Sequence, residues 1–250
     1  MDFCFYSGTS AIDGAPIVGV VTGLNRSSRN PKTGEMLQVW ILRSDMHPMD
    51  AVRSGADSAI CGDCFHRGDD SRKRSCYVRV GNAPSKIYEA YRRGRYPLIS
   101  LPWAASLAMG KSVRCGAYGD PCAIPYEYWS WLPSDSTGYT HQWKWCDHRF
   151  ASFLMASVDS LAERILAKSL GFRTFRVRPA TADKSKLHAI ATNERLCPAA
   201  SETSSEVTCK KCMGCGGFSH GRFSTRDYVI MAHGAGAPAF GTGIGASNVA

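Results

Sequence analysis

Residues 153–177 decide the fold. Their sequence is Phe153-Leu-Met-Ala-Ser-Val-Asp-Ser-Leu-Ala-Glu-Arg-Ile-Leu-Ala-Lys-Ser-Leu-Gly-Phe-Arg-Thr-Phe-Arg-Val177. It begins with a short apolar run, 153–158, of the kind that forms a buried strand. A second strand is predicted over 172–177. Two strands joined by a helix form a βαβ unit, which predicts a parallel sheet. Parallel sheets of this kind bind their ligands at the carboxyl ends of the strands.

The connecting helix is predicted over 161–170 from its end signals. Ser160 and Glu163 have the spacing of a capping box, in which each side chain satisfies backbone N–H groups at the helix start. Gly171 stands where a glycine commonly ends a helix. The apolar face of this helix is expected at Leu161, Ile165 and Leu166.

Working outward, residues 17–21 and 37–43 have the composition of strands, and turn residues separate them. Residues 84–93 are predicted to form a helix that starts at a proline and ends before Gly94. A second short helix is expected over 124–131. The predicted fold class is therefore α/β with a parallel sheet, either doubly wound or closed into a barrel.

The bulk composition indicates an ordinary folded chain. Of 250 residues, 44% are hydrophobic, and no apolar run is long enough to span a bilayer. The first residues lack the basic and apolar regions of a signal peptide. We therefore expect a cytoplasmic protein without a membrane partner. The net charge of +9 permits contact with nucleic acid, although the basic residues are mostly scattered.

In a reducing compartment, eleven cysteines indicate metal ligands rather than disulfides. Group one is Cys61-x2-Cys64-x11-Cys76. Three thiolates on one loop can hold a [4Fe–4S] cluster and leave one iron open. With His66 the same loop would instead complete a tetrahedral zinc site. Soft thiolates suit both metals, so the ligand type leaves the choice open.

Group two is Cys197-x11-Cys209-x2-Cys212-x2-Cys215. A run of Cys-x2-Cys-x2-Cys is similar to the ligand loop of ferredoxin-type clusters, with a fourth cysteine from elsewhere. Four thiolates also form a closed structural zinc site. The pattern predicts a metal without identifying it, and whether the two groups form one site or two stays open.

Other residues with reactive side chains have ordinary structural explanations. We expect small buried cysteines without ligand spacing at Cys115, Cys122 and Cys146. His141 is expected to be a hydrogen-bonded core histidine. Packing roles are expected for Trp129, Trp131, Trp143 and Trp145.

Several segments between about residues 20 and 217 resemble an uncharacterised protein family of bacteriophages and prophages. These segments are Ile60-Cys-Gly-Asp-Cys64, Cys76-Tyr-Val78, Tyr118-Gly-Asp-Pro121, Gly138-Tyr-Thr-His-Gln-Trp143, Met155-Ala-Ser-Val-Asp-Ser160 and Phe172-Arg-Thr-Phe-Arg-Val177. The resemblance implies a phage-infected or lysogenic bacterial host as the setting. It implies no particular activity.

The order of the parts also resembles the radical S-adenosylmethionine superfamily. In that pattern, a cysteine loop after the first barrel strand holds a [4Fe–4S] cluster, and a Gly-Gly-Glu-Pro-like turn contacts the methionine amino group. The corresponding turn here ends in Gly119-Asp120-Pro121, with Asp120 in place of the usual glutamate. Ser157 and Asp159 would lie where the family holds ribose or carboxylate. The usual Cys-x3-Cys-x2-Cys spacing is absent, since the spacing here is x2 and then x11.

The resemblance implies a complete or partial TIM-type barrel over 1–190, with the cysteine loop at 61–76. A metal-binding segment over 191–233 would pack on it, and a flexible Gly- and Ala-rich tail would follow over 234–250. The implied function is an iron–sulfur, radical S-adenosylmethionine-like enzyme with a small-molecule cosubstrate and a substrate that the residues do not identify. The alternative is a zinc-stabilised nucleic-acid-binding phage protein without catalytic activity. No catalytic side chain and no oligomeric state follow from the sequence.

Overall fold

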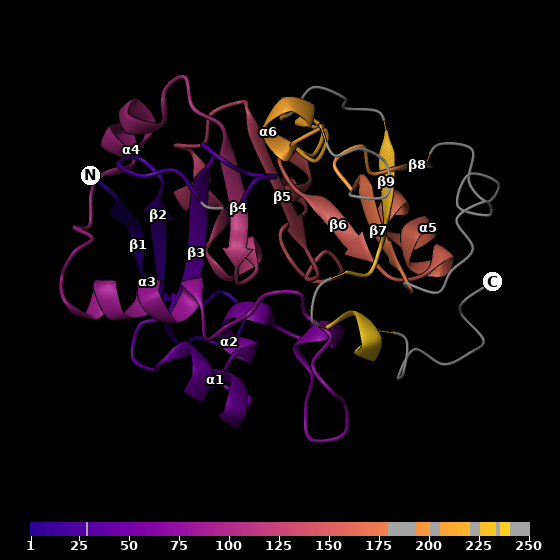
Figure 1. The fold of residues 1–250 in the computed structure, drawn as a ribbon, viewed down its shortest axis with the longest axis horizontal. Helices are drawn as coiled ribbons and strands as arrows, with labels where there is room; N and C mark the ends of the chain where they lie inside the picture. Colours follow the sequence, from indigo (N-terminus) through magenta and orange to yellow (C-terminus); the bar gives the residue numbers. More distant parts are fainter. Residues whose placement is uncertain (29, 180–193, 201–205, 221–225, 234–235, 241–250) are drawn as a thin grey trace.

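The computed structural model describes residues 1–28, 30–179, 194–200, 206–220, 226–233 and 236–240. It is a mixed α/β protein built on one sheet (Figure 1). No helix within these ranges combines the length and the apolar character needed to cross a membrane.

The sheet has nine strands in the order β1-β2-β3-β4-β5-β6-β7-β9-β8 and is not closed. β1 to β3 pair antiparallel, and every other neighbouring pair is parallel. The strands are β1 (Phe3–Thr9), β2 (Pro16–Thr22), β3 (Leu37–Arg43), β4 (Val113–Tyr118), β5 (Ser136–Thr140), β6 (Met155–Val158), β7 (Thr174–Arg178), β8 (Glu194–Leu196) and β9 (Asp227–Met231). A mostly parallel sheet is thus confirmed, and the antiparallel start was not predicted.

The helices lie in the connections between strands (Figure 1). The α-helices are α1 (Pro48–Ser54), α2 (Ser58–Cys61), α3 (Ala83–Arg92), α4 (Leu101–Ala108), α5 (Leu161–Ser169) and α6 (Cys209–Cys212). Short 3-10 helices are η1 (Phe65–Arg67), η2 (Pro121–Ala123), η3 (Tyr126–Trp129), η4 (His148–Ser152) and η6 (Ala237–Ala239). The helix expected over 84–93 is confirmed as α3. The one expected over 124–131 is only the single 3-10 turn η3.

The predicted βαβ unit is present as β6, α5 and β7, with the two strands parallel. Ser160 Oγ accepts the N–H of Glu163 at 3.1 Å, and the Glu163 carboxylate accepts the N–H of Asp159 at 2.9 Å. These bonds satisfy N–H groups that the first helical turn leaves without partners. Gly171 has φ +90°, so it ends the helix in the left-handed conformation.

The expected apolar face of α5 is wrong in part, because Ile165 and Leu166 are 68% and 47% exposed. The side of the helix that meets the sheet is formed instead by buried Ala167 and by two cations. Arg164 and Lys168 lie one turn apart and both bond the buried carboxylate of Asp227 on β9, at 2.8 and 2.9 Å. A pattern of apolar residues does not detect a face that is anchored by ion pairs.

Aromatic residues fill the core beside the antiparallel strands. Trp129 and Trp131 are buried and pack with ring centroids 5.2 Å from Phe5 on β1. Trp143 is buried as well, and its indole N–H donates to the carbonyl of Ser157. The packing role is confirmed for these three tryptophans. It is wrong for Trp145, which is 76% exposed.

Candidate metal and ligand site

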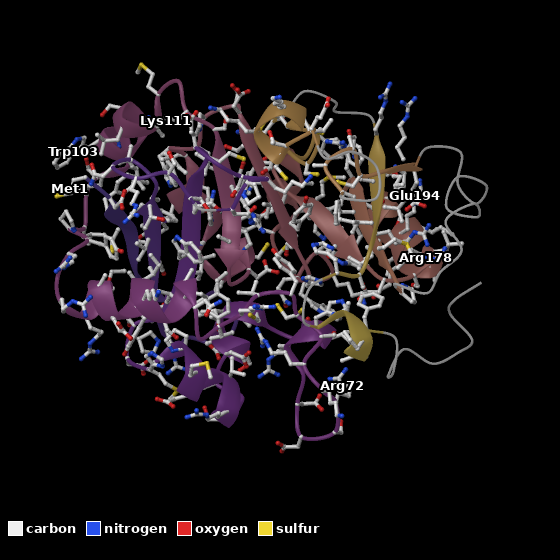
Figure 2. All side chains as sticks on the ribbon, viewed as in Figure 1. Met1, Arg72, Trp103, Lys111, Arg178 and Glu194 are labelled. Atoms are coloured by element: carbon white, nitrogen blue, oxygen red, sulfur yellow. The ribbon has the colours of Figure 1, made fainter. Side chains whose placement is uncertain are left out.

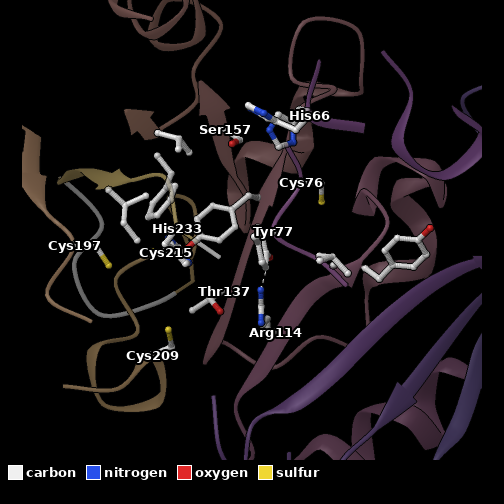
Figure 3. A pocket seen from close by; sticks show the side chains of 18 of the residues that line it. His66, Cys76, Tyr77, Arg114, Thr137, Ser157, Cys197, Cys209, Cys215 and His233 are labelled. Carbon is white, nitrogen blue, oxygen red and sulfur yellow. Dashed lines mark hydrogen bonds between the residues drawn. The ribbon is translucent and has the colours of Figure 1, made fainter. Parts of the chain in front are cut away.

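Both cysteine groups open into one cavity of about 530 Å³. The parallel strands line it with alternate residues, as Arg114, Gly116 and Tyr118 of β4 show. Figure 3 shows Cys76 on one side of the Tyr77 and Arg114 side chains and Cys209 on the other. The volume lies in the range of small-molecule sites. All eleven cysteines are free thiols, as predicted.

Group one lies at the carboxyl ends of the strands. Cys61 ends α2, and its carbonyl accepts the side-chain amide of Gln142, just beyond β5, at 3.0 Å. The N–H of Asp120, just beyond β4, bonds the carbonyl of Ile60 at 2.6 Å. The loop also closes on itself, because the His66 carbonyl accepts the N–H of Cys76 at 2.9 Å. These bonds hold the cysteines at the sheet edge where parallel folds bind ligands.

The cysteines of group one are partly buried, and their thiols influence one another. Burial raises the pKa of Cys64 to about 12. Burial is also the main cause that raises the pKa of Cys61 well above 9.0, and the neighbouring thiols of Cys64 and Cys76 raise it further. Burial raises the pKa of Cys76 as well. A metal bound here would have to displace these protons.

Cys209, Cys212 and Cys215 of group two lie on a loop near the amino ends of the same strands, whereas Cys197 follows the short edge strand β8. Cys209 begins α6, and its N–H bonds the carbonyl of Lys32 in the segment that precedes β3. The carbonyl of Cys215 accepts the N–H of Gly138 on β5 at 2.9 Å. Cys197, just beyond β8, bonds the carbonyl of Val229 on β9 through its N–H.

The buried guanidinium of Arg173 holds this loop from the other side. It donates to the carbonyls of Gly217 at 2.7 Å, Gly214 at 3.0 Å and Arg226. Burial lowers the pKa of Arg173, and the neighbouring Cys215 raises it in part. Three backbone carbonyls around one cation fix the turns that carry the last cysteine of the group.

The thiols of group two also neighbour one another. Burial raises the pKa of Cys197 to about 11, and Cys209 and Cys212 add to the shift. Burial raises the pKa of Cys215 as well, and a hydrogen bond from the Tyr139 side chain partly offsets that shift. The two groups therefore form two separate sets of thiols, with group one at the carboxyl ends of the strands and most of group two near their amino ends.

Neither set has the arrangement of a preformed site for a single ion. Among the described residues, no group of three or more His, Cys, Asp or Glu side chains could hold a metal ion. Thiolates on one zinc ion lie within about 4 Å of one another, because Zn–S bonds are about 2.3 Å long. A single zinc would therefore require the side chains of either group to move closer together.

His66 is engaged at both ring nitrogens. Nδ1 lies 2.7 Å from the hydroxyl of Ser75, and Nε2 lies 2.8 Å from a carboxylate oxygen of Asp159. The ring also stacks on buried Phe240 with centroids 5.0 Å apart. A zinc ion at His66 would have to displace one of these partners. Phe240 belongs to the segment expected to be a free tail, whose residues 234–235 and 241–250 lie outside the described ranges.

The residues proposed to bind the cosubstrate lie around the group-one end. Gly119, Asp120 and Ser157 line the cavity. Pro121 begins η2. Asp159 does not line the cavity itself, but it hydrogen-bonds His66, which does. Gly119 has φ +78°, and a Cβ there would lie 2.7 Å from Ile41, so the close approach of β3 requires glycine.

Asp120 has both oxygens engaged. One oxygen accepts the N–H of Cys122 at 3.0 Å, and the other accepts the N–H of His141 at 2.7 Å. Burial raises the pKa of this carboxyl, and these hydrogen bonds partly offset the shift. In this arrangement Asp120 orders the ends of β4 and β5.

Three polar atoms at this end have no hydrogen-bond partner among the described residues. They are Oη of Tyr118, Nε2 of His141 and Oδ1 of Asp159, which lie at or just beyond the ends of β4, β5 and β6. His141 is therefore not the fully bonded core histidine that was predicted. Buried polar groups without partners are rare and costly in folded proteins. Their gathering at one end of a cavity indicates capacity for a polar ligand.

Sequence reasoning missed two relationships here. Arg114 lines the cavity, and alternation along β4 could have indicated it, since Arg114, Gly116 and Tyr118 share one face. Cys122 and Cys146 have no ligand spacing, but they lie side by side. Burial raises the pKa of Cys122, and the neighbouring Cys146 raises it further. Cys115 and Cys122 are buried as predicted, and Cys146 is partly buried.

Comparisons with protein-family models, with curated proteins and with solved structures find no match. The function is therefore argued from the geometry of this cavity.

Proposed function

We propose that the chain is a radical S-adenosylmethionine-like iron–sulfur enzyme on a partial parallel barrel. One observation carries the proposal. Cys61, Cys64 and Cys76 line the same cavity as Tyr118 and His141, each of which has a buried polar atom without a partner among the described residues. The group-one cysteines lie at the carboxyl ends of the parallel strands, where barrel enzymes hold their cofactors.

The donor set of group one fits a cluster better than a single ion. A [4Fe–4S] cube takes one thiolate at each of several separate corners, so its ligands stand farther apart than those of one zinc. The thiols of Cys61, Cys64 and Cys76 neighbour one another and line one cavity, which supports the placement of three thiolates at separate corners of one cluster. Cys61, Cys64 and Cys76 would hold the cluster and leave one iron open to a cosubstrate.

A bound cluster of this kind supplies one electron to the sulfonium of S-adenosylmethionine, which releases a radical that abstracts hydrogen. The chain's own residues would bind and orient the cosubstrate. Oδ1 of Asp159 can accept from an amino or ribose hydroxyl group, and Nε2 of His141 and the Tyr118 hydroxyl can bond a carboxylate or the adenine edge. Gly119, Asp120 and Ser157 would shape that end of the cavity.

Group two would hold a second cluster or a structural zinc. Its loop is anchored to β5 through Gly138 and to Arg173, so the four thiols Cys197, Cys209, Cys212 and Cys215 come from a fixed frame. A metal here would add folding energy to the amino end of the sheet. Eleven free thiols suit a reducing compartment, such as the cytoplasm of a bacterial host.

The rival function is a zinc-stabilised protein that binds nucleic acid through its net charge of +9. Some of the Lys and Arg side chains, such as Arg72 (labelled in Figure 2), pair with carboxylates within the molecule, and these pairs leave the net charge of +9 unchanged. Ion pairs to carboxylates involve Arg43, Arg53, Arg67, Arg72, Arg74, Lys144, Arg149, Arg164, Lys168, Arg176 and Lys210. We prefer the enzyme because the cysteines of both groups line one cavity of small-molecule size.

The test compares Cys64→Ala with Cys146→Ala after purification without oxygen. Both cysteines are partly buried, and only Cys64 belongs to group one. We expect Cys64→Ala to lose about four irons relative to the wild type and to lose cleavage of S-adenosylmethionine under reducing conditions, whereas Cys146→Ala keeps both. Equal iron in the two variants would contradict the assignment of group one.

A further inference from the structure

Arg114 lines the cavity and has no acidic partner among the residues that the structure describes. It is the second residue of β4 and lines the space between the two cysteine groups (Figure 3). One of its terminal nitrogens donates to the Tyr77 hydroxyl at 2.5 Å. Within the described ranges, no carboxylate lies within ion-pair distance of Arg114.

Three other basic side chains that line the cavity, those of Lys32, His66 and Arg74, have partners within the protein. Arg74 pairs with Asp57 at 3.2 Å, His66 bonds Asp159, and the ammonium of Lys32 donates to the carbonyl of Val207 at 3.3 Å. A guanidinium offers five N–H donors in a planar fork, so Arg114 retains donors for a further group. Its surroundings therefore differ from those of the paired cations around it.

The cavity wall around Arg114 includes Gly116 and Tyr77. Two residues along the strand, Gly116 also lines the cavity, and a Cβ there would lie 2.9 Å from the carbonyl oxygen of Gly119. The Gly116 φ of +70° marks an irregular point where the pairing of β3 and β4 shifts. Tyr77 is 46% exposed while lining the cavity, and it stacks on His233. The Arg114 guanidinium therefore lies beside a partly exposed aromatic ring.

We propose that Arg114, assisted by the Tyr77 hydroxyl, is an anion-binding subsite that holds the carboxylate or phosphate group of the substrate between the two cysteine groups. The guanidinium fork matches the two oxygens of either anion. The distance along β4 from Arg114 to Tyr118 separates this subsite from the polar atoms at the carboxyl end. Naming the anion as substrate rests on the proposed enzymatic function; the binding itself does not.

The experiment measures thermal unfolding of the full chain, as purified, against rising inorganic phosphate at constant ionic strength. A parallel titration with acetate distinguishes a phosphate from a carboxylate ligand. Phosphate or acetate should raise the unfolding temperature to a plateau, because a ligand that binds only the folded state stabilises it. Arg114→Gln should need at least about tenfold more anion for the same shift, since charge-assisted hydrogen bonds are lost.

Two further variants keep the result decisive. Arg149→Gln removes an exposed arginine that pairs with Asp147 and Glu127, and it should titrate like the wild type. Arg114→Lys keeps the charge without the fork and should bind with intermediate strength. It also supplies the comparison if Arg114→Gln does not fold.

An unchanged titration in Arg114→Gln, or no response of the wild type to either anion, would overturn the inference. Loss of metal from Arg114→Gln with unchanged anion binding would also overturn it, because Arg114 would then neutralise the group-two thiolates. Iron content is measured on the same samples. If iron is present but anion binding does not depend on Arg114, the proposed enzyme stands and the subsite is refuted. If anion binding depends on Arg114 but iron is absent, the subsite stands and the proposed enzyme is refuted.

Discussion

The imidazole of His66 and the carboxylate of Asp159 lie 2.8 Å apart, between Nε2 and Oδ2. His66 belongs to the cysteine loop, and Asp159 follows β6, so this one contact ties the group-one loop to the end of a parallel strand. The second oxygen of Asp159 has no partner among the described residues. The same carboxylate thus positions the cysteine loop through one oxygen, while its other oxygen is buried.

Asp159→Asn is expected to impair cosubstrate use while preserving the fold. The amide keeps the shape of the side chain and loses the charge, and hydrogen bonds to a charged group are worth about 1.5–3 kcal/mol. Cleavage of S-adenosylmethionine should therefore fall roughly ten- to hundredfold. The control is Asp147→Asn, an exposed carboxylate paired with Arg149. Equal activity of the two variants would contradict the role of Asp159.

Arg173→Met should loosen the group-two loop. It removes the donor that bonds three backbone carbonyls in a buried position, and those carbonyls would lose their partner. We expect the free energy of unfolding in urea to fall by about 2–4 kcal/mol. Arg149→Met, at an exposed ion pair, should cost no more than about 1 kcal/mol. Similar losses in the two variants would show that the loop does not depend on Arg173.

Cys212→Ala should release the metal of group two and lower the thermal unfolding temperature. A lost metal site destabilises strongly, and in a chain of this size each 1 kcal/mol shifts that temperature by roughly 2–4 °C. We expect a fall of at least about 6 °C, with group-one iron retained. Cys146→Ala serves as the control. Retained metal and an unchanged temperature would show that Cys212 is not a ligand.

His220 predicts a pH dependence of stability below neutrality. Burial lowers the pKa of His220 from 6.5, and the bond to the Ser152 carbonyl only partly offsets this. The unfolded chain therefore binds a proton more readily than the folded one, so stability rises with pH through the region below 6.5 and is lost as the pH falls.

His220→Gln should flatten that part of the curve, measured as the urea midpoint between about pH 5 and 7.5. His148→Gln, at an exposed histidine, should leave the curve unchanged. A slope that persists in His220→Gln would assign the effect to other groups.

The sequence predicted those parts of the fold that local signals encode. Local signals were enough to place β6, α5 and β7. These signals are two apolar strands, the capping pair Ser160 and Glu163, and Gly171 at the helix end. The exposed Ile165 and Leu166 were not predicted, because the buried partner Asp227 lies more than fifty residues away. Ion pairs between distant segments leave no local periodicity.

The candidate site was predictable only in its ligand types. Cysteine spacing identified both groups, and the order of parts indicated Gly119, Asp120, Ser157 and Asp159. The placement of group one and of the loop 209–215 at opposite ends of the same strands depends on long-range bonds such as Gly138 to Cys215. Arg114 was missed because an arginine in a strand most often faces solvent, and only the assembled cavity shows otherwise.

The central claim is that group one holds a [4Fe–4S] cluster. Its most direct test is the metal content and visible absorbance of protein purified without oxygen. We expect about four irons at group one, with about four more or one zinc at group two, and a broad visible absorbance that is lost in air. Two zincs without iron would contradict the claim and favour the zinc-stabilised nucleic-acid-binding protein.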